Sequence, residues 1–212
     1  MSLLLDEVQN GAPGRPMVDL GPDWVVAEMP PGYQNRVAEI QRLTADLHEM
    51  SRFGRLLREV GPGLAEAVCG VFAALKFEAS TDLGPDGTGV VVKLDGQRRL
   101  LMHMSGEEQT IEKKNAELAR VFQMLHEFAD EHDRVVFVTN NEPGKRPTDR
   151  AESLAREALA LLGRMGAVHV PASTLFTLWK LSLLDADRAR AQVQGLYAQE
   201  GGSFQIPASA FR

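Results

Sequence analysis

The clearest periodic signal lies between residues 33 and 60, where apolar side chains recur at alternating spacings of three and four. The series runs Ile40, Leu43, Leu47, Met50 and, seven residues later, Leu57. Such spacing predicts an amphipathic helix with the a/d seam of a coiled coil. Two interpretations remain open: the helix packs on its own domain, or it pairs two chains as a homodimer. In the second case Gly54 occupies an a position, which shortens the seam.

A second helix is predicted from residue 64 to 75, after the break at Gly61-Pro62-Gly63. A short strand over 77–80 and a turn-rich loop over 83–89 follow it.

The next segment has the pattern of a β-hairpin. Residues 90–94 form a β-branched run, and residues 99–104 form a second apolar run. Asp95-Gly96 lies between them and predicts a tight turn of type I′.

Helices and strands alternate along the rest of the chain. Helices are predicted over 107–131, 151–165, 173–184 and 186–198, and strands over 134–139 and 167–170. The strand over 134–139 is continuously apolar, which is typical of a strand covered on both faces. The order predicts an α/β fold with a mixed central sheet flanked by helices.

The first 32 residues differ from the rest. They contain five of the eleven prolines and little periodicity, which predicts a flexible arm. Trp24 lies in the short apolar patch of this arm, and we expect it to dock on the body of the protein or, as the less favoured alternative, on a partner. The expected organisation is an arm (1–32), a helix (33–60), an α/β core (61–184) and a C-terminal helix with a tail (185–212).

Composition narrows the functional classes. The 212 residues are 44% hydrophobic, which suffices for one medium domain with appendages, and the net charge is −6. Nucleic-acid binders generally present a basic face, so nucleic acid is a disfavoured partner. The single cysteine, Cys69, provides neither a disulfide nor a multi-cysteine zinc site. No apolar run is long enough for a membrane span, and the first residues lack a basic signal-peptide region. We therefore expect a cytoplasmic protein without a membrane anchor. We also expect no cofactor.

The succession of elements resembles the restriction-endonuclease-like, or PD-(D/E)XK, superfamily, and bacterial domains of it in particular. The likeness covers roughly residues 56–184. It starts with a helix and the Asp95-Gly96 hairpin, and it ends in a short strand that leads into a helix containing Leu175-Phe176. The resemblance implies an αβα sandwich.

In that superfamily two carboxylates on the hairpin hold Mg²⁺, and a lysine two residues beyond the second activates water. The resemblance places these three roles at Gly89, His103 and Ser105, so both metal carboxylates and the basic group are missing. An auxiliary helix acid would correspond to Glu66. The resemblance therefore implies a degenerate member, a pseudo-nuclease.

Neighbouring acids suggest an alternative. Asp86 and Glu107, with Glu108 beside it, could form a displaced metal site, although a turn and a first helical turn explain the same residues and are favoured. The loop over 140–147 is polar and locally basic, which suits either a solvated connector or a binding loop.

Three functions are compatible with these patterns. The first is a non-enzymatic interaction, scaffold or regulatory module with protein partners, in which Trp24 and the seam of the first helix make contacts. The second is a magnesium-dependent nuclease or nucleic-acid-binding protein with displaced ligands. The third is a small-molecule or nucleotide sensor that uses the cleft around Gly89, His103 and Ser105. The missing carboxylates favour the first, without enzymatic activity.

Overall fold

The computed structural model describes residues 23–84 and 86–211, and it divides the chain into two compact units, Met1–Met50 and Ser51–Arg212. Most of the predicted arm, residues 1–22, lies outside the described residues. Within the first unit, α2 (Asp23–Glu28) contains Trp24, whose side chain is 70% exposed. Helix α3 (Tyr33–Arg52) is amphipathic, as predicted, and none of its residues is buried.

The predicted helix over 33–60 is wrong at its C-terminal end. α3 ends at Arg52, and a 3₁₀ turn, η1 (Phe53–Leu57), follows it. The turn carries large apolar side chains into the core of the second unit: Leu56 is fully buried, and the ring of Phe53 stacks on Trp179 with centroids 4.5 Å apart. Gly54 and Leu57 are therefore not part of a continuous helical seam, which is restricted to α3.

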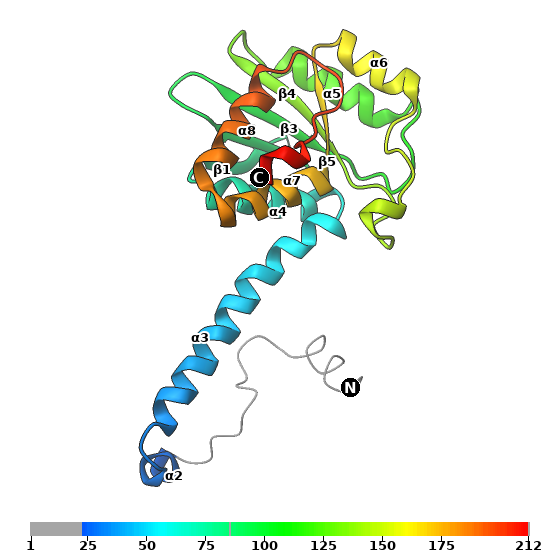
Figure 1. Cartoon of the computed structure of the whole chain (residues 1–212). Coiled ribbons are helices and arrows are strands. Elements are labelled where there is room, and N and C mark those ends of the chain that lie inside the picture. Colours follow the sequence, from blue (N-terminus) through cyan, green and yellow to red (C-terminus); the bar gives the residue numbers. More distant parts are fainter. Residues whose placement is uncertain (1–22, 85, 212) are drawn as a thin grey trace. The chain divides into compact units, whose positions relative to one another are not determined.

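The second unit is built on a five-stranded mixed sheet (Figure 1). Its strands are β1 (Glu78–Leu83), β2 (Gly89–Lys93), β3 (Arg99–Met104), β4 (Asp133–Thr139) and β5 (Val168–Pro171), in that spatial order. The first three strands form an antiparallel meander, and β3, β4 and β5 run parallel. The α/β class and the mixed sheet were both predicted correctly.

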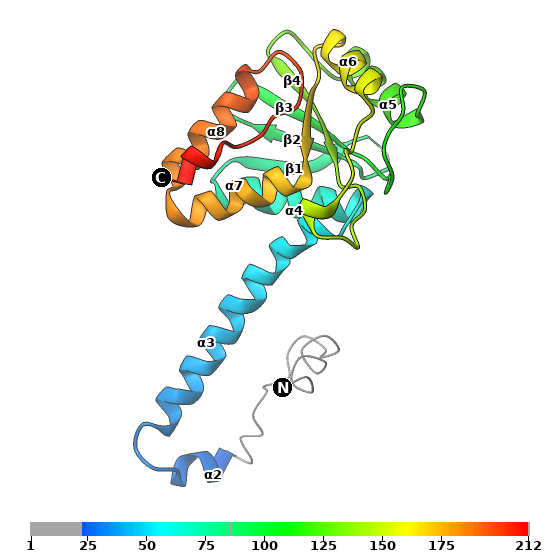
Figure 2. The same ribbon diagram turned by 45° about the vertical axis from the view of Figure 1, so that its right-hand side comes forward.

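Helices cover both faces of this sheet, which gives three layers (Figures 1 and 2). One face packs against α4 (Gly61–Ala74), α7 (Ala172–Leu184) and α8 (Ala186–Ala198), and the other against α5 (Ala116–Glu127) and α6 (Arg156–Arg164). Strand β3 shows why: Leu100 and Met102 face the first layer of helices, whereas Leu101 faces the second. Alternation along a strand therefore supplies two separate cores.

The β2–β3 turn differs from the predicted type I′ turn. The backbone N–H of Leu94 donates to the carbonyl of Arg98, and the Asp95 carboxylate accepts from the N–H groups of Gln97 and Arg98. Gly96 does not have the positive φ that a type I′ turn requires. The loop is therefore longer, and the Asp95 side chain closes it.

Two helices begin later than predicted, for one shared reason. The N–H of Ile111 donates to the Ser153 carbonyl, and the N–H of Ala155 donates to the Ile111 carbonyl. This pairing holds both segments extended, so α5 begins after its cap Asn115 and α6 after Ala155. Consequently Ile111 is buried outside any helix, and neither Glu107 nor Glu108 lies in a first helical turn.

Candidate functional site

The hairpin brings together the positions at which the superfamily resemblance places two metal carboxylates and a water-activating lysine. Gly89 and His103 are directly paired across β2 and β3, and Ser105 follows at the end of β3. All three are buried. The hydroxyl of Ser105 accepts from the N–H of Glu107, and its backbone N–H donates to the Val138 carbonyl. The remaining predicted position, Glu66, has an exposed side chain paired with Arg55.

Backbone fills the space in which a side chain at position 89 would lie. A Cβ atom added to Gly89 would be 1.9 Å from the carbonyl oxygen of Leu83, in the neighbouring strand β1. Such a distance is far inside van der Waals contact, so β1 would have to move to admit any side chain. The present backbone therefore leaves no room for a metal-binding aspartate at this position.

His103 is part of a buried hydrogen-bonded network on the α5 face of the sheet. Its ring stacks on Phe137 with centroids 5.8 Å apart, and its Nε2 lies 2.5 Å from Oε2 of Glu117. Burial raises the pKa of Glu117, but the hydrogen bond and charge of His103, together with Arg120, outweigh that effect and hold the pKa below its usual value. The carboxylate is thus ionised, and His103 Nε2 carries the hydrogen that it accepts.

The same network continues from His103 to the loop before β2. The hydroxyl of Thr88 lies 3.4 Å from Nδ1 of His103 and 2.8 Å from Oδ1 of Asp86. The N–H of Thr88 also donates to this Asp86 oxygen. Because the ionised Asp86 can only accept, the Thr88 hydroxyl gives its proton to that carboxylate and cannot serve as a nucleophile activated by His103.

The candidate metal ligands Asp86 and Glu107 are not brought into one cluster. Asp86 is occupied by Thr88, and within residues 23–84 and 86–211 no three His, Cys, Asp or Glu side chains are arranged to hold a metal ion. Glu117 was missed by sequence reasoning, because one acid in the first turn of an amphipathic helix resembles an ordinary dipole partner.

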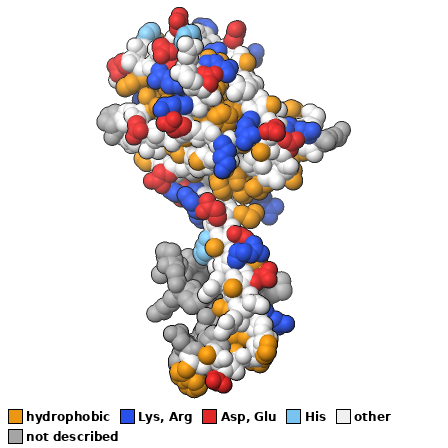
Figure 3. All heavy atoms as spheres, turned by 90° about the vertical axis from the view of Figure 1, so that its left-hand side faces the viewer, with side chains coloured by type: hydrophobic (Ala, Val, Ile, Leu, Met, Phe, Trp, Pro, Cys, Tyr) orange, Lys and Arg blue, Asp and Glu red, His pale blue; other side chains and the backbone are white. Residues whose placement is uncertain are grey.

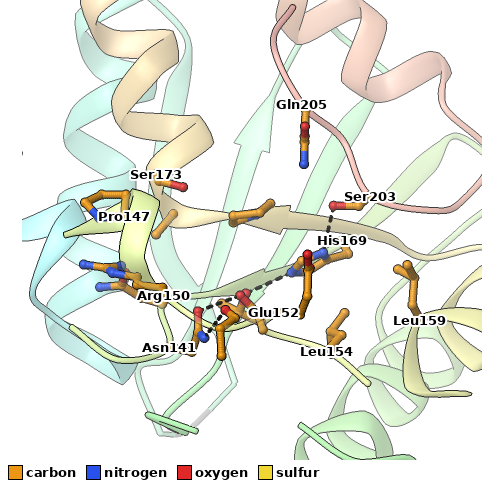
Figure 4. Close-up of a pocket in the computed structure, with 16 residues that line it drawn as sticks. Asn141, Pro147, Arg150, Glu152, Leu154, Leu159, His169, Ser173, Ser203 and Gln205 are labelled. Atoms are coloured by element: carbon orange, nitrogen blue, oxygen red, sulfur yellow. Dashed lines mark hydrogen bonds between the residues drawn. The ribbon is translucent and has the colours of Figure 1, made fainter. Parts of the chain in front are cut away.

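A pocket of about 190 Å³ lies elsewhere, at the carboxyl ends of β4 and β5 and the first turn of α7 (Figure 4). Open α/β sheets commonly bind ligands outside the carboxyl ends of their strands. The pocket is lined mainly by polar side chains from the β4–α6 loop, β5, α7 and the C-terminal segment, among them Asn140, Asn141, Arg150, Glu152, His169, Ser173, Ser203 and Gln205.

His169 is the buried titratable group of this pocket. Its Nε2 lies 2.9 Å from the hydroxyl oxygen of Thr139, and its Nδ1 lies 3.0 Å from that of Ser203. Burial lowers the pKa of His169 to about 4, so the ring is neutral at physiological pH. Both ring nitrogens face hydroxyl groups and neither faces a carboxylate, and so low a pKa makes the ring a weak base. The arrangement therefore suits binding better than nucleophilic catalysis.

Arg150 is held in place entirely by neutral acceptors. Its Nη1 donates to Oδ1 of Asn140 and its Nη2 to the carbonyl of Leu57, both at 2.5 Å, and its Nε donates to the carbonyl of Lys145 at 3.0 Å. Burial lowers the pKa of Arg150, while the nearby Glu142 partly opposes this effect. Within the described part of the chain no carboxylate forms an ion pair with this guanidinium.

Comparison with known proteins gives no relative: no family model, no curated protein and no solved structure matches the chain. In residues 23–84 and 86–211, every helix is too short or too polar to cross a membrane.

Proposed function

We propose that this chain is a non-enzymatic interaction or regulatory module, built on a degenerate restriction-endonuclease-like fold, that associates with a second copy of itself through α3. One observation carries the proposal: α3 is a 20-residue amphipathic helix in which no residue is buried. Most helical stability in proteins comes from packing of an apolar face, and α3 leaves its apolar face unburied.

The topology of the second unit supports the superfamily assignment. Helix α4, the antiparallel strands β1 to β3, helix α5 and the parallel strand β4 follow the succession that the sequence resemblance implies. The filled space beside Gly89 and the buried His103–Glu117 pair support the absence of nuclease chemistry. Acidic and basic side chains are also interspersed on the face shown in Figure 3, whereas a nucleic-acid binder would gather basic ones.

The apolar seam of α3 has the spacing of a coiled coil. Ile40 and Leu47 occupy a positions, Leu43 and Met50 occupy d positions, and all four side chains are exposed, Leu47 to 63%. Burying one such side chain fully is worth about 1.5–3 kcal/mol. These side chains are 45–63% exposed, so pairing two α3 helices would remove part of the surface of eight side chains from water, which favours association.

Charges beside the seam favour a parallel pair of identical helices. Glu39 and Asp46 occupy g positions, and Thr44 and Ser51 occupy e positions. In a parallel dimer each g acid faces a neutral hydroxyl residue of the partner, whereas an antiparallel dimer would oppose the g acids to one another. Arg42, at position c, pairs with both acids on its own helix. A second copy is therefore compatible with the seam in the parallel orientation.

Light scattering on the full chain tests this proposal. We expect a mass twice the 23.2 kDa of one chain, and a mass of 23.2 kDa for Leu47→Asp, which puts a charge in the seam. Ala45→Asp is the matched control, because it adds the same charge at an f position that faces away from the seam. A wild-type mass of one chain at every concentration would contradict the proposal, and so would equal effects of the two variants.

A further inference from the structure

We infer that the pocket at the carboxyl ends of β4 and β5 binds a small organic oxyanion, a carboxylate or a phosphate monoester, through Arg150. This site is separate from the hairpin around Gly89, His103 and Ser105, and it does not depend on association through α3. The inference rests on four features: a hollow, a guanidinium held in place by neutral acceptors, polar groups that converge on that hollow, and a second hollow beside it.

The guanidinium of Arg150 is fixed, and within residues 23–84 and 86–211 it forms no ion pair, although Glu142 is near enough to interact with it electrostatically. Three of the five N–H groups of Arg150 are used to hold the guanidinium in place, and their acceptors are an amide oxygen and two backbone carbonyls. Asn140 is itself fixed, because its amide donates to the Glu59 carbonyl at 2.7 Å. A bound oxyanion would use the two remaining N–H groups and relieve the cost of a partly buried charge.

Polar groups from two further segments converge on the same hollow (Figure 4). Ser173 lies in the first turn of α7, and Ser203 and Gln205 come from the C-terminal segment. The first turn of α7 has no side-chain cap, since Pro171 precedes it. Its N–H groups therefore add donors beside Arg150. His169 fixes the Ser203 hydroxyl by a hydrogen bond, so this wall of the pocket is ordered before a ligand arrives.

Size and surrounding charge limit the ligand. A hollow of about 190 Å³ is smaller than the roughly 300–1,000 Å³ typical of drug-sized ligands, so it fits the head group of a small molecule. Glu152 also lines the pocket, and Glu142 lies close enough to Arg150 to affect its pKa. These two carboxylates oppose a highly charged ligand and favour one with a single oxyanion group.

The rest of the ligand has a defined place. A second hollow of about 330 Å³ shares Pro147, Pro171, Ser173 and Gln205 with the first. Its other lining residues are uncharged: Thr148, Thr174, Thr177 and Ile206. A ligand with an oxyanion head at Arg150 would therefore lay an uncharged body along the start of α7.

Amide NMR titrations of the full chain with sodium acetate and with inorganic phosphate, at constant ionic strength, test this inference. We expect saturable shifts centred on Ser173, Thr174 and the side chain of Arg150 for at least one of the two anions. Acetate alone would identify a carboxylate site, phosphate alone a phosphate site, and both a general oxyanion site. Shifts scattered over the surface, or none that saturate, would overturn the inference.

Two matched substitutions make the test specific. Arg150→Gln should weaken the affinity for the anion by about tenfold or more, since it removes charged hydrogen bonds. Arg146→Gln removes the same charge from the same loop, but it does not line the pocket and should change the affinity less than about twofold. Equal losses of affinity in the two variants would mean that the anion is attracted only by the general positive charge of this loop, and they would overturn the inference. Should Arg150→Gln unfold, as circular dichroism would reveal, the location of the wild-type shifts decides the outcome.

Discussion

Nε2 of His103 lies 2.5 Å from Oε2 of Glu117, and the two residues are only 3% and 5% exposed. The pair joins β3 to α5 inside an otherwise apolar core. Arg120 and the N–H of Gly106 bind the other carboxylate oxygen of Glu117. Both oxygens of this buried carboxylate thus have partners, which is the condition under which a buried charge can be tolerated.

Glu117→Gln should destabilise the fold. The substitution keeps the shape of the side chain but removes the charge that His103 and Arg120 face, and hydrogen bonds to charged groups contribute about 1.5–3 kcal/mol. We expect a loss of that order in the free energy of unfolding measured with urea. The matched control is Glu127→Gln, on the exposed side of the same helix, which should change it by less than about 0.5 kcal/mol. Equal changes in the free energy of unfolding for the two variants would show that the hydrogen bonds of Glu117 do not stabilise the fold.

Glu117 should also make the free energy of unfolding fall at acid pH. The folded-state pKa of Glu117 is below its ordinary value of 4.5, so its contribution is present above pH 4.5 and is lost as the pH falls through the folded-state pKa. Urea denaturation between pH 6 and pH 3 should show this loss, with a smaller pH dependence in Glu117→Gln. An identical pH dependence in both proteins would contradict the assignment.

His169 should make the stability of the fold depend on pH in a higher range than Glu117 does. Its pKa is about 4 in the folded state and 6.5 ordinarily, so on acidification the unfolded chain takes up a proton before the folded chain does. Stability is therefore lost as the pH falls from 6.5 towards 4, by up to about 3 kcal/mol. His169→Gln, which does not titrate, should flatten this part of the stability curve. Loss of stability between pH 6.5 and 4.5 that persists unchanged in the variant would argue for another group.

Gly89→Ala should be strongly destabilising although it lies in a strand, where replacing glycine by alanine usually stabilises through the unfolded state. The added Cβ would meet the Leu83 carbonyl, and we expect a loss of about 2 kcal/mol or more. Gly96→Ala is the control, because nothing lies within 4 Å of its added Cβ and its φ is not positive. Thermal unfolding of both variants measures the difference, and a Gly89→Ala variant as stable as wild type would refute the steric argument.

Cys69 should react slowly with thiol reagents. Burial and then the negative charges of Asp82 and Glu66 raise the pKa of its thiol to about 11. Because the thiolate is the nucleophile, alkylation at pH 8 should be on the order of a hundredfold slower than that of a free cysteine. The same chain in urea provides the control, and it should react at the ordinary rate. Equal rates with and without urea would mean that Cys69 is not protected.

Sequence reasoning succeeded where local patterns decide the structure. The β-branched run over 90–94 and its apolar partner form the hairpin, and α7 and α8 lie close to their predicted spans. It failed where a distant segment decides. α5 begins late because Ile111 pairs with the backbone of residues 153–155, and no pattern around residue 107 records that contact.

The candidate sites show the same division. Gly89 and His103 were named from the hairpin, and their direct pairing follows from its register. Glu117 was overlooked because its burial depends on how α5 packs on β3. The pocket could not be predicted, since Arg150 is fixed through the Leu57 carbonyl, 93 positions away in sequence. The sequence indicated this region only through the polar loop over 140–147, which was compatible with a binding loop.

The contact between position 89 and the Leu83 carbonyl has a consequence for protein engineering. Introducing acidic and basic side chains at Gly89, His103 and Ser105 is the direct way to attempt a metal site in this hairpin. Because main-chain atoms of β1 occupy the required volume, point substitutions would yield a poorly folded chain instead of an active one. A designer would first have to reshape the edge strand and its irregular pairing between Ser80 and Leu83, and only then change the side chains.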